Sequence, residues 1–210
     1  MSAEATPLTA FALNCSLKSS ASSERSSTDR LIADLFDALS AHGVAGTVER
    51  AADRNIKPGV TSDEGSGDEW PAIREQILAA DIFILGTPIW LGQPSSIAKR
   101  VVERMDAFLS ETDDAGRMPP FGKVAIVAVV GNEDGAHHCH AAMFQALNDV
   151  GFTIPANAGV YWVGEAMQAF NYVDLETIPD PVQQTIAMAA SNAAHLARCL
   201  KRDAYPPPQK

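Results

Sequence analysis

The sequence is poor in positive charge. Its 210 residues hold 16 lysines and arginines against 26 aspartates and glutamates, which gives a formal net charge of −10. A protein that binds nucleic acid needs many Lys or Arg contacts to phosphate groups. The charge balance therefore argues against nucleic acid as a partner, although it is compatible with a local pocket for one phosphate group.

Cysteines and long apolar runs are also scarce. Cys15, Cys139 and Cys199 are an odd number at wide spacing without a CxxC pair, which indicates reduced thiols rather than a disulfide framework. No stretch approaches the ~18 apolar residues that span a bilayer, and the first residues lack the basic start and apolar run of a secretory signal. We expect no membrane insertion and a cytoplasmic location.

What the chain does contain is typical of a globular protein. Hydrophobic residues make up 46% and charged residues 20%, which excludes a disordered chain. The length suits a single domain, which we predict over residues 1–202. Residues 203–210 are predicted to be an exposed tail, because Tyr205-Pro206-Pro207-Pro208 cannot continue a helix.

Short apolar runs alternate with longer amphipathic segments, a pattern that predicts an α/β, doubly wound parallel sheet with helices on both faces. The predicted strands cover residues 9–14, 44–50, 81–86, 124–130 and 152–162, the last interrupted near Pro155. The predicted helices begin at Thr28, Trp70, Ser95 or Ser96, Ala136 and Val182, and the third runs through Phe108. The acidic stretch 53–69 is predicted to be a surface loop.

In such a sheet, ligands bind beyond the carboxyl ends of the strands. The loop 14–28, after the first strand, is dense in Ser and Thr and opens directly into a helix. Helix N–H groups, hydroxyls and the charge of Lys18 together favour an anion such as phosphate. The loop has neither the GxxxxGK[ST] nor the GxGxxG pattern, and the alternative is a flexible serine-rich linker.

Two further loops suit a flat ligand. In the segment 86–96, glycines and prolines shape the backbone, Trp90 offers an apolar wall, and amides near Trp90 and Gly92 are available to ring carbonyls. The segment 131–138 combines turn residues with polar groups at a helix start. The alternatives are that Ile89, Trp90 and Leu91 simply cover the sheet end, and that the later loop is ordinary turn chemistry.

Together these loops resemble the flavodoxin-like NAD(P)H-dependent FMN reductases and NAD(P)H:quinone oxidoreductases, from the first strand to the last helix. Ser16, Lys18, Ser27 and Thr28 match the family's phosphate loop. Segment 87–92, followed by Pro94-Ser95 and the helix through Lys99 and Arg104, is similar to its flavin-ring loop, and segment 131–135 to the loop over the other side of the ring. The resemblance implies a five-stranded flavodoxin-like sheet of order 2-1-3-4-5.

The resemblance also implies FMN as cofactor and NADPH or NADH as reductant. A ping-pong cycle would pass electrons to a quinone, flavin or similar small acceptor, with the flavin N5 carrying the hydride chemistry and no catalytic side chain. A homodimer or homotetramer is expected. The implied FMN-binding residues, with Ser26 added by adjacency, are Ser16, Lys18, Ser26, Ser27, Thr28, Pro88, Ile89, Trp90, Leu91, Gly92, Gly131, Asn132, Glu133, Asp134 and Gly135.

Other functions are open at this stage. A flavodoxin-type electron carrier between protein partners is the main alternative, and a fold that has lost flavin and serves as an interaction domain is another. His137 and His140 share a helix face, but no second ligand cluster supports a metal site. Surface histidines at the helix start, or one histidine near the flavin, are expected instead. The absence of GxSxG argues against a Ser-His-Asp hydrolase. Trp162, Phe170 and Tyr172 are expected to be partly exposed, either as an acceptor platform or as packing at an edge.

Overall fold

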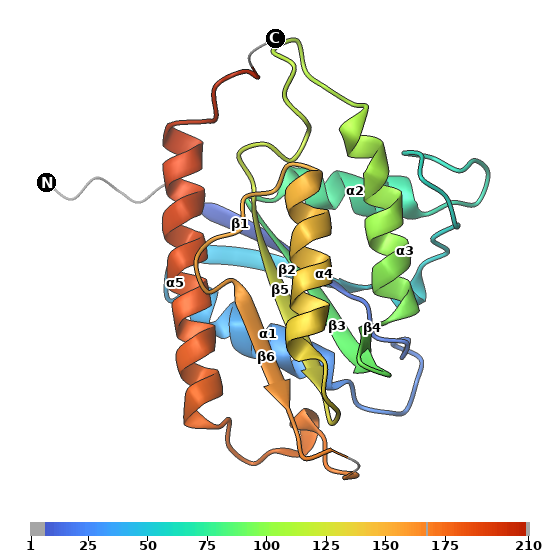
Figure 1. The fold of residues 1–210 in the computed structure, drawn as a ribbon, viewed down its shortest axis with the longest axis vertical. Coiled ribbons are helices and arrows are strands. Elements are labelled where there is room, and N and C mark those ends of the chain that lie inside the picture. Colours follow the sequence, from blue (N-terminus) through green and yellow to red (C-terminus); the bar gives the residue numbers. More distant parts are fainter. Residues whose placement is uncertain (1–6, 167, 209–210) are drawn as a thin grey trace, which may run out of the picture.

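The computed structural model describes residues 7–166 and 168–208. Its strands are β1 (Leu8–Asn14), β2 (Val44–Arg50), β3 (Ile82–Trp90), β4 (Gln93–Pro94), β5 (Val124–Gly131) and β6 (Gly159–Val163) (Figure 1). Its α-helices are α1 (Ser27–Ser40), α2 (Trp70–Ala79), α3 (Ser96–Arg104), α4 (Ala136–Asp149) and α5 (Asp180–Arg202). Short 3₁₀ helices lie at Ala51–Asp53, Met105–Leu109 and Tyr172–Asp174.

The sheet has the order β2-β1-β3-β5-β6, and all four of these pairings are parallel. The two-residue β4 folds back antiparallel on the end of β3. Without β4, the order of the long strands is the predicted 2-1-3-4-5. Strand order reverses between β1 and β3. A flavodoxin-like fold places its ligand at such a reversal, beyond the carboxyl ends of the strands.

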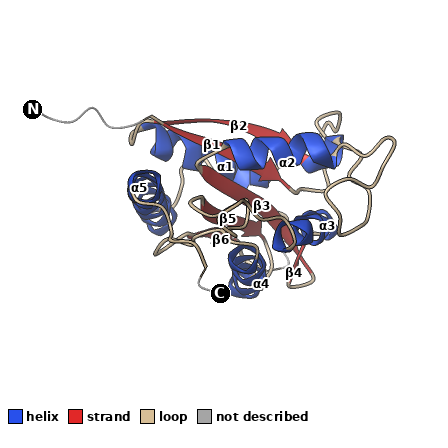
Figure 2. Ribbon diagram, turned by 90° about the horizontal axis from the view of Figure 1, so that it is seen from above, coloured by secondary structure: helices blue, strands red, loops and turns tan. Residues whose placement is uncertain are grey.

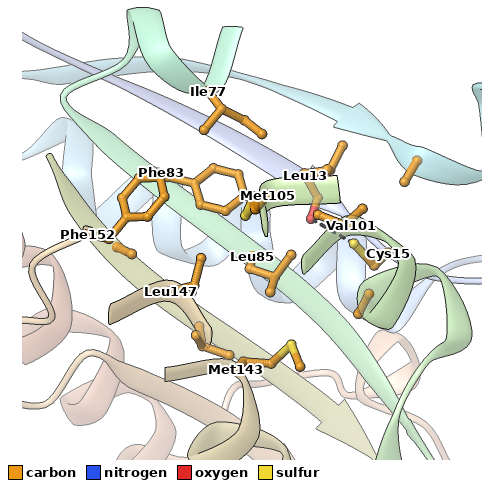
Figure 3. Close-up of a cluster of buried hydrophobic side chains, with 14 of the residues drawn as sticks. Leu13, Cys15, Ile77, Phe83, Leu85, Val101, Met105, Met143, Leu147 and Phe152 are labelled. Atoms are coloured by element: carbon orange, nitrogen blue, oxygen red, sulfur yellow. Dashed lines mark hydrogen bonds between the residues drawn. The ribbon is translucent and has the colours of Figure 1, made fainter. Parts of the chain in front are cut away.

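Helices cover both faces of the sheet (Figure 2). Successive side chains of β3 point to opposite faces: Phe83 and Leu85 pack with residues of α2, α3 and α4, and Ile82 and Ile84 pack with residues of α1 and α5. In the first of these clusters, Phe83 lies between Phe152 and Ile77, and Leu147 and Met143 pack below Leu85 (Figure 3). The two buried clusters confirm the prediction of an α/β sheet covered on both sides.

Three predicted boundaries differ from the structure. β3 continues past residue 86 because it pairs with β5 up to Pro88 and then with β4. The strand predicted over 152–162 is reduced to β6, with a single bridge from Thr153 to Val124, since Pro155 lacks the N–H that a ladder requires. The helix predicted through Phe108 ends at Arg104 and continues as a 3₁₀ turn.

The stretch predicted as a surface loop, 53–69, is anchored in the interior. Asp68 and Arg104 form a fully buried ion pair at 2.8 Å, and Arg104 also donates to the carbonyls of Lys57 and Thr61. Burial opposes ionisation of Asp68, but Arg104 and three backbone N–H groups hold the pKa of this carboxyl well below its usual range. Arg104 therefore fixes this loop from the interior.

Candidate functional site

A cleft lies beyond the carboxyl ends of β1, β3 and β5, and all three predicted loops line it. The lining residues are Ser16, Leu17, Lys18, Arg25, Ser26, Ser27, Thr28, Pro88, Ile89, Trp90, Val130, Gly131, Asn132, Glu133, Trp162, Asn171 and Tyr172. The cleft brings together eleven of the fifteen predicted residues. Leu91, Gly92, Asp134 and Gly135 are the four predicted residues that are not among its lining.

One end of the cleft is the beginning of α1. Ser26 is the N-cap, and its Oγ accepts a hydrogen bond from the Asp29 N–H at 3.2 Å. Ser16, Ser26 and Thr28 are buried side chains at this end. The first N–H groups of a helix have no acceptor within the helix and carry the positive end of its dipole. Hydroxyls and N–H groups here form a donor set suited to a phosphate.

A buried side chain that the sequence analysis did not single out shapes this end. Asn14 Oδ1 accepts from the Ser16 N–H at 2.8 Å, and Asn14 Nδ2 donates to Asp29. Asp29 in turn forms an ion pair with Arg50 on β2. The chain Ser16–Asn14–Asp29–Arg50 therefore fixes the loop and balances the carboxylate in the first turn of α1.

The cations at the same end are already engaged. Lys18 Nζ lies 3.0 Å from Glu24 and donates to the Arg25 carbonyl at 3.1 Å. Arg25, which the prediction omitted, lines the cleft and donates to the Val173 carbonyl at 2.8 Å. Lys18 thus shares its charge with Glu24, and Arg25 is a second cation within the cleft wall.

The other end of the cleft is the hairpin between β3 and β4. Leu91 and Gly92 have φ values of +52° and +73°, as in the two-residue turns that join antiparallel strands. Trp90 is 52% exposed and Leu91 is 92% exposed. The N–H groups of Leu91 and Gly92 donate to Glu133 Oε1 and Oε2, each at 3.1 Å. The amides predicted to be available to a ring are therefore bound to a carboxylate.

The loop after β5 packs its backbone on this hairpin. Asp134 Oδ1 accepts from the Gly135 N–H at 2.7 Å. Gly135 has φ +123°, and a Cβ there would lie 2.7 Å from the Gly92 Cα, so only glycine fits. Asp134 and Gly135 therefore shape the wall behind the cleft.

A fourth wall comes from residues 168–175, which we call the strap. Asn132 Nδ2 donates to the Gln168 carbonyl at 2.8 Å, and the Val173 N–H donates to Ser27 Oγ at 3.2 Å. Arg30 Nη1 donates to the carbonyls of Tyr172 at 3.0 Å and Leu175 at 2.6 Å. These contacts join parts of the chain that are far apart in the sequence, and no local pattern indicates them.

The aromatic residues near the strap differ from the prediction. Tyr172 is fully buried, its hydroxyl donates to Asp34 at 2.6 Å, and its ring packs on Trp162 with centroids 5.6 Å apart. Burial, reinforced by Asp34, raises the pKa of the Tyr172 hydroxyl well above its usual range. The expected partial exposure is wrong for Tyr172 and for Trp162, which is also buried, whereas Phe170 is half-exposed.

The histidines of α4 do not surround the cleft. His137 and His140 both pack edge-on against Tyr161 of β6. Burial lowers the pKa of His140 to about 4, so the expected surface position is wrong for this residue. Within residues 7–166 and 168–208, no three His, Cys, Asp or Glu side chains gather as a metal-binding group.

The described part of the chain has no helix that is both long enough and apolar enough to cross a membrane.

The sheet order, and the cleft beyond the carboxyl ends of its strands, are those of a flavodoxin-like protein. Residues 9–168 match the model of the NADPH-dependent FMN reductase family, and the chain belongs to this family. The family description names FMN as the flavin and NADPH as the reductant.

Two relatives cover most of this chain. The 8-demethyl-8-aminoriboflavin-5'-phosphate synthase of Streptomyces davaonensis is 31% identical over 208 residues, which are 94% of this chain and 80% of that protein. A 204-residue region of the divalent metal cation transporter MntH of Mycobacterium bovis is 35% identical and covers 94% of this chain. This chain spans only 30% of the transporter's length.

Among solved structures, RosB with bound 8-demethyl-8-formylriboflavin-5'-phosphate matches with a TM-score of 0.84 and 32% identity, over 94% of this chain and 82% of that chain. An NADH:FMN oxidoreductase, EmoB, matches with a TM-score of 0.64 and 16% identity, over 90% and 88% of the two chains. The second likeness concerns the fold alone.

The cleft fits FMN on its own chemistry. Buried hydroxyls and the start of α1 suit a phosphate group. Ile89, Trp90 and Trp162 provide apolar surface for a ring system, and polar groups of Asn132 and Glu133 lie on the opposite loop.

Proposed function

We propose that this protein passes electrons from NADPH or NADH through bound FMN to a quinone, a flavin or a similar small acceptor in a ping-pong cycle. The observation that carries this proposal is a single cleft with a phosphate-type donor set at one end and apolar walls at the other. When bound, FMN supplies the hydride-accepting N5 atom. The chain's own residues hold and orient the reactants.

In this proposal the hydroxyls of Ser16, Ser26, Ser27 and Thr28 bind the phosphate, and Lys18 contributes charge. Ser26 Oγ already accepts from Asp29, and Ser27 Oγ from Val173. Each hydroxyl hydrogen remains free to donate to a phosphate oxygen. Both serines would therefore keep their structural contacts while they bind the ligand.

At the other end, Pro88, Ile89 and Trp90 form one wall for the ring, and Gly131, Asn132 and Glu133 form the other. Leu91, Gly92, Asp134 and Gly135 act from behind these walls by fixing the backbone. Because Trp90 is half-exposed, nicotinamide and acceptor would use the same open side in turn, which a ping-pong cycle requires. No side chain needs to act as acid or base.

The visible spectrum of the purified protein tests this proposal, recorded before and after addition of FMN and then of NADPH or NADH without oxygen. Flavin bands that bleach on addition of a nicotinamide support a reductase and identify the preferred nicotinamide. Bound flavin that bleaches only with dithionite supports the electron-carrier alternative. Absence of flavin binding contradicts both and favours an interaction domain.

A second candidate function follows from two relatives. The name of the Streptomyces synthase describes a riboflavin-5'-phosphate changed at position 8, and the intermediate bound to RosB is also changed at position 8. In that case FMN would be the substrate of this chain rather than its cofactor. Incubation with FMN, followed by heat release and mass measurement of the flavin, tests this. The incubation includes an oxidant and an amino donor, which exchange of the 8-methyl group for an amino group requires. A recovered flavin of unchanged mass contradicts this second function.

We also propose that the protein assembles as a homodimer or homotetramer. Light scattering coupled to size-exclusion chromatography measures the molar mass directly, and a value near the 22.3 kDa of one chain contradicts this proposal.

A further inference from the structure

One carboxylate binds two consecutive backbone N–H groups at the ring end of the cleft. Glu133 Oε1 and Oε2 accept from Leu91 and Gly92 at 3.1 Å each. Glu133 belongs to the loop after β5, whereas Leu91 and Gly92 form the turn that prolongs β3. The side chain therefore bridges the two loops that we propose to flank the flavin ring.

The charge of this carboxylate is the next feature that bears on a ligand. Among the residues that the structure describes, no Lys, Arg or His forms an ion pair with Glu133. Its two backbone donors are its hydrogen-bond partners, and Glu133 lines the cleft. A ligand that entered between the loops would meet an uncompensated negative charge at this point.

The hairpin does not depend on Glu133 alone. His138 Nε2 and Gln93 Oε1 lie 2.9 Å apart, and the backbones at Gly92 and Gly135 are in close contact. Because these contacts hold the hairpin against the start of α4, the two N–H groups would keep their positions if Glu133 turned away.

We propose that Glu133 is a displaceable latch, a specificity-determining residue whose carboxylate occupies the Leu91 and Gly92 N–H groups until a ring carbonyl takes them. This inference rests on the proposed flavin site. A flavin ring presents neighbouring neutral acceptors, such as the C4 carbonyl oxygen and N5, which match two adjacent donors. A ligand that binds only when the latch is open has its affinity reduced by the fraction of closed molecules.

The latch has opposite effects on the free protein and on the complex. Glu133→Gln keeps the shape, but its one carbonyl oxygen accepts a single neutral hydrogen bond and its NH2 group cannot accept from the other N–H. The free protein should therefore unfold at a lower denaturant concentration. The same change weakens the competitor of the ring, so FMN binds about threefold to tenfold more tightly. If Glu133 merely supported the fold, its substitution would lower both the stability to denaturant and the affinity for FMN.

The test compares wild type, Glu133→Gln and Glu133→Ala by titration with FMN and with riboflavin, which lacks the phosphate. Both variants are expected to bind both ligands more tightly by the same factor, because the change concerns the ring. Displacement of FMN by inorganic phosphate measures the affinity of the phosphate end, at the start of α1. This phosphate affinity is expected to be the same in wild type and in both Glu133 variants. Glu165→Gln removes an exposed charge from the loop after β6 and serves as control.

Binding kinetics give an independent measurement. In wild type, the observed rate of flavin binding is expected to level off at high flavin concentration, when opening of the latch limits it. In Glu133→Ala it should stay linear.

The latch is overturned if both Glu133 variants bind riboflavin equally well or more weakly than wild type, or if Glu165→Gln tightens binding to the same degree. Absence of flavin binding in wild type would instead overturn the proposed function, so the two failures are distinct.

Discussion

The two ends of the cleft are built differently. At the start of α1, buried hydroxyls are fixed by Asn14, which connects Ser16 to Asp29 and Arg50. At the hairpin, Trp90 and Leu91 are exposed, and the two N–H groups of the turn donate to one carboxylate from another loop. The end at α1 is therefore fixed before any ligand binds, whereas the N–H groups of the hairpin can exchange Glu133 for another acceptor. The difference suggests that the first end sets affinity for the phosphate and the second governs access of the ring.

The largest effect is expected from breaking the rigid end. Asn14→Leu leaves the Ser16 N–H and Asp29 without their buried partner and should lower the free energy of unfolding by about 2–4 kcal/mol. FMN affinity should fall much more than riboflavin affinity, because the loss is at the phosphate end.

Chemical denaturation and the two flavin titrations measure this difference. Asn192→Leu removes an exposed amide that donates to the Ala156 carbonyl and should cost less than about 1 kcal/mol. Equal loss of affinity for both flavins in Asn14→Leu would show that the two ends are not independent.

A change of pH should affect the helix that follows the ring loop. Burial lowers the pKa of His140 on α4 to about 4, whereas an unfolded histidine titrates near about 6.5. Between these values the unfolded chain binds more protons, so stability decreases as pH falls from 6.5 to 4. The contribution is about 2–3 kcal/mol across this window.

Denaturation curves at several pH values measure it. His140→Leu should remove most of this pH dependence, whereas His42→Gln, at a partly exposed position outside this helix, should retain it. A His140→Leu profile that is parallel to wild type would assign the dependence to other groups.

Removal of the exposed Trp90 side chain should change flavin affinity more than it changes the free energy of unfolding. Trp90→Ala is expected to weaken both FMN and riboflavin binding about tenfold, through loss of aromatic contact. Its unfolding free energy should change by less than about 0.5 kcal/mol, because half of the side chain is in solvent.

Flavin fluorescence titration measures the affinities, with Tyr205→Ala, an exposed aromatic residue outside the cleft, as control. Unchanged affinity and turnover in Trp90→Ala would exclude the proposed ring wall.

The smallest effect concerns the turn itself. Leu91 adopts φ +52° with an almost fully exposed side chain, so its backbone is strained without a packing gain. Leu91→Asn should raise the free energy of unfolding by about 0.5 kcal/mol, because asparagine tolerates this conformation better. Leu91→Val should lower it, and thermal unfolding of the two variants gives the sign. If both lower stability, Leu91 has a contact in solution that outweighs the strain.

The sequence predicted well what depends on local patterns. The uniformly apolar run of β5 could only be a central strand. Ser95 was one of the two predicted starts of α3, and it is the N-cap, where its Oγ accepts from the Ala98 N–H at 3.0 Å. The three loops meet in one cleft because parallel strands end at the same edge.

What the sequence did not predict depends on partners far away in the chain. Arg30 holds a strap more than 140 residues further on, and the length of that connection leaves no periodic signal. Glu133 looked like a turn residue, because nothing local indicates that its carboxylate reaches the hairpin. Arg104 lies on the predicted helix, but its buried partner Asp68 could not be inferred from spacing.

The ion pair of Asp68 and Arg104 changes how one part of the sequence should be treated in protein engineering. Polar, glycine-containing segments such as 53–69 are usually chosen for inserted tags, because exposed loop tips tolerate extra residues. Here the guanidinium of Arg104 closes the segment from inside by binding Lys57, Thr61 and Asp68 together. An insertion between these three residues would separate the partners of the buried Arg104 guanidinium. It would therefore disrupt the interior of the protein instead of adding residues to its surface.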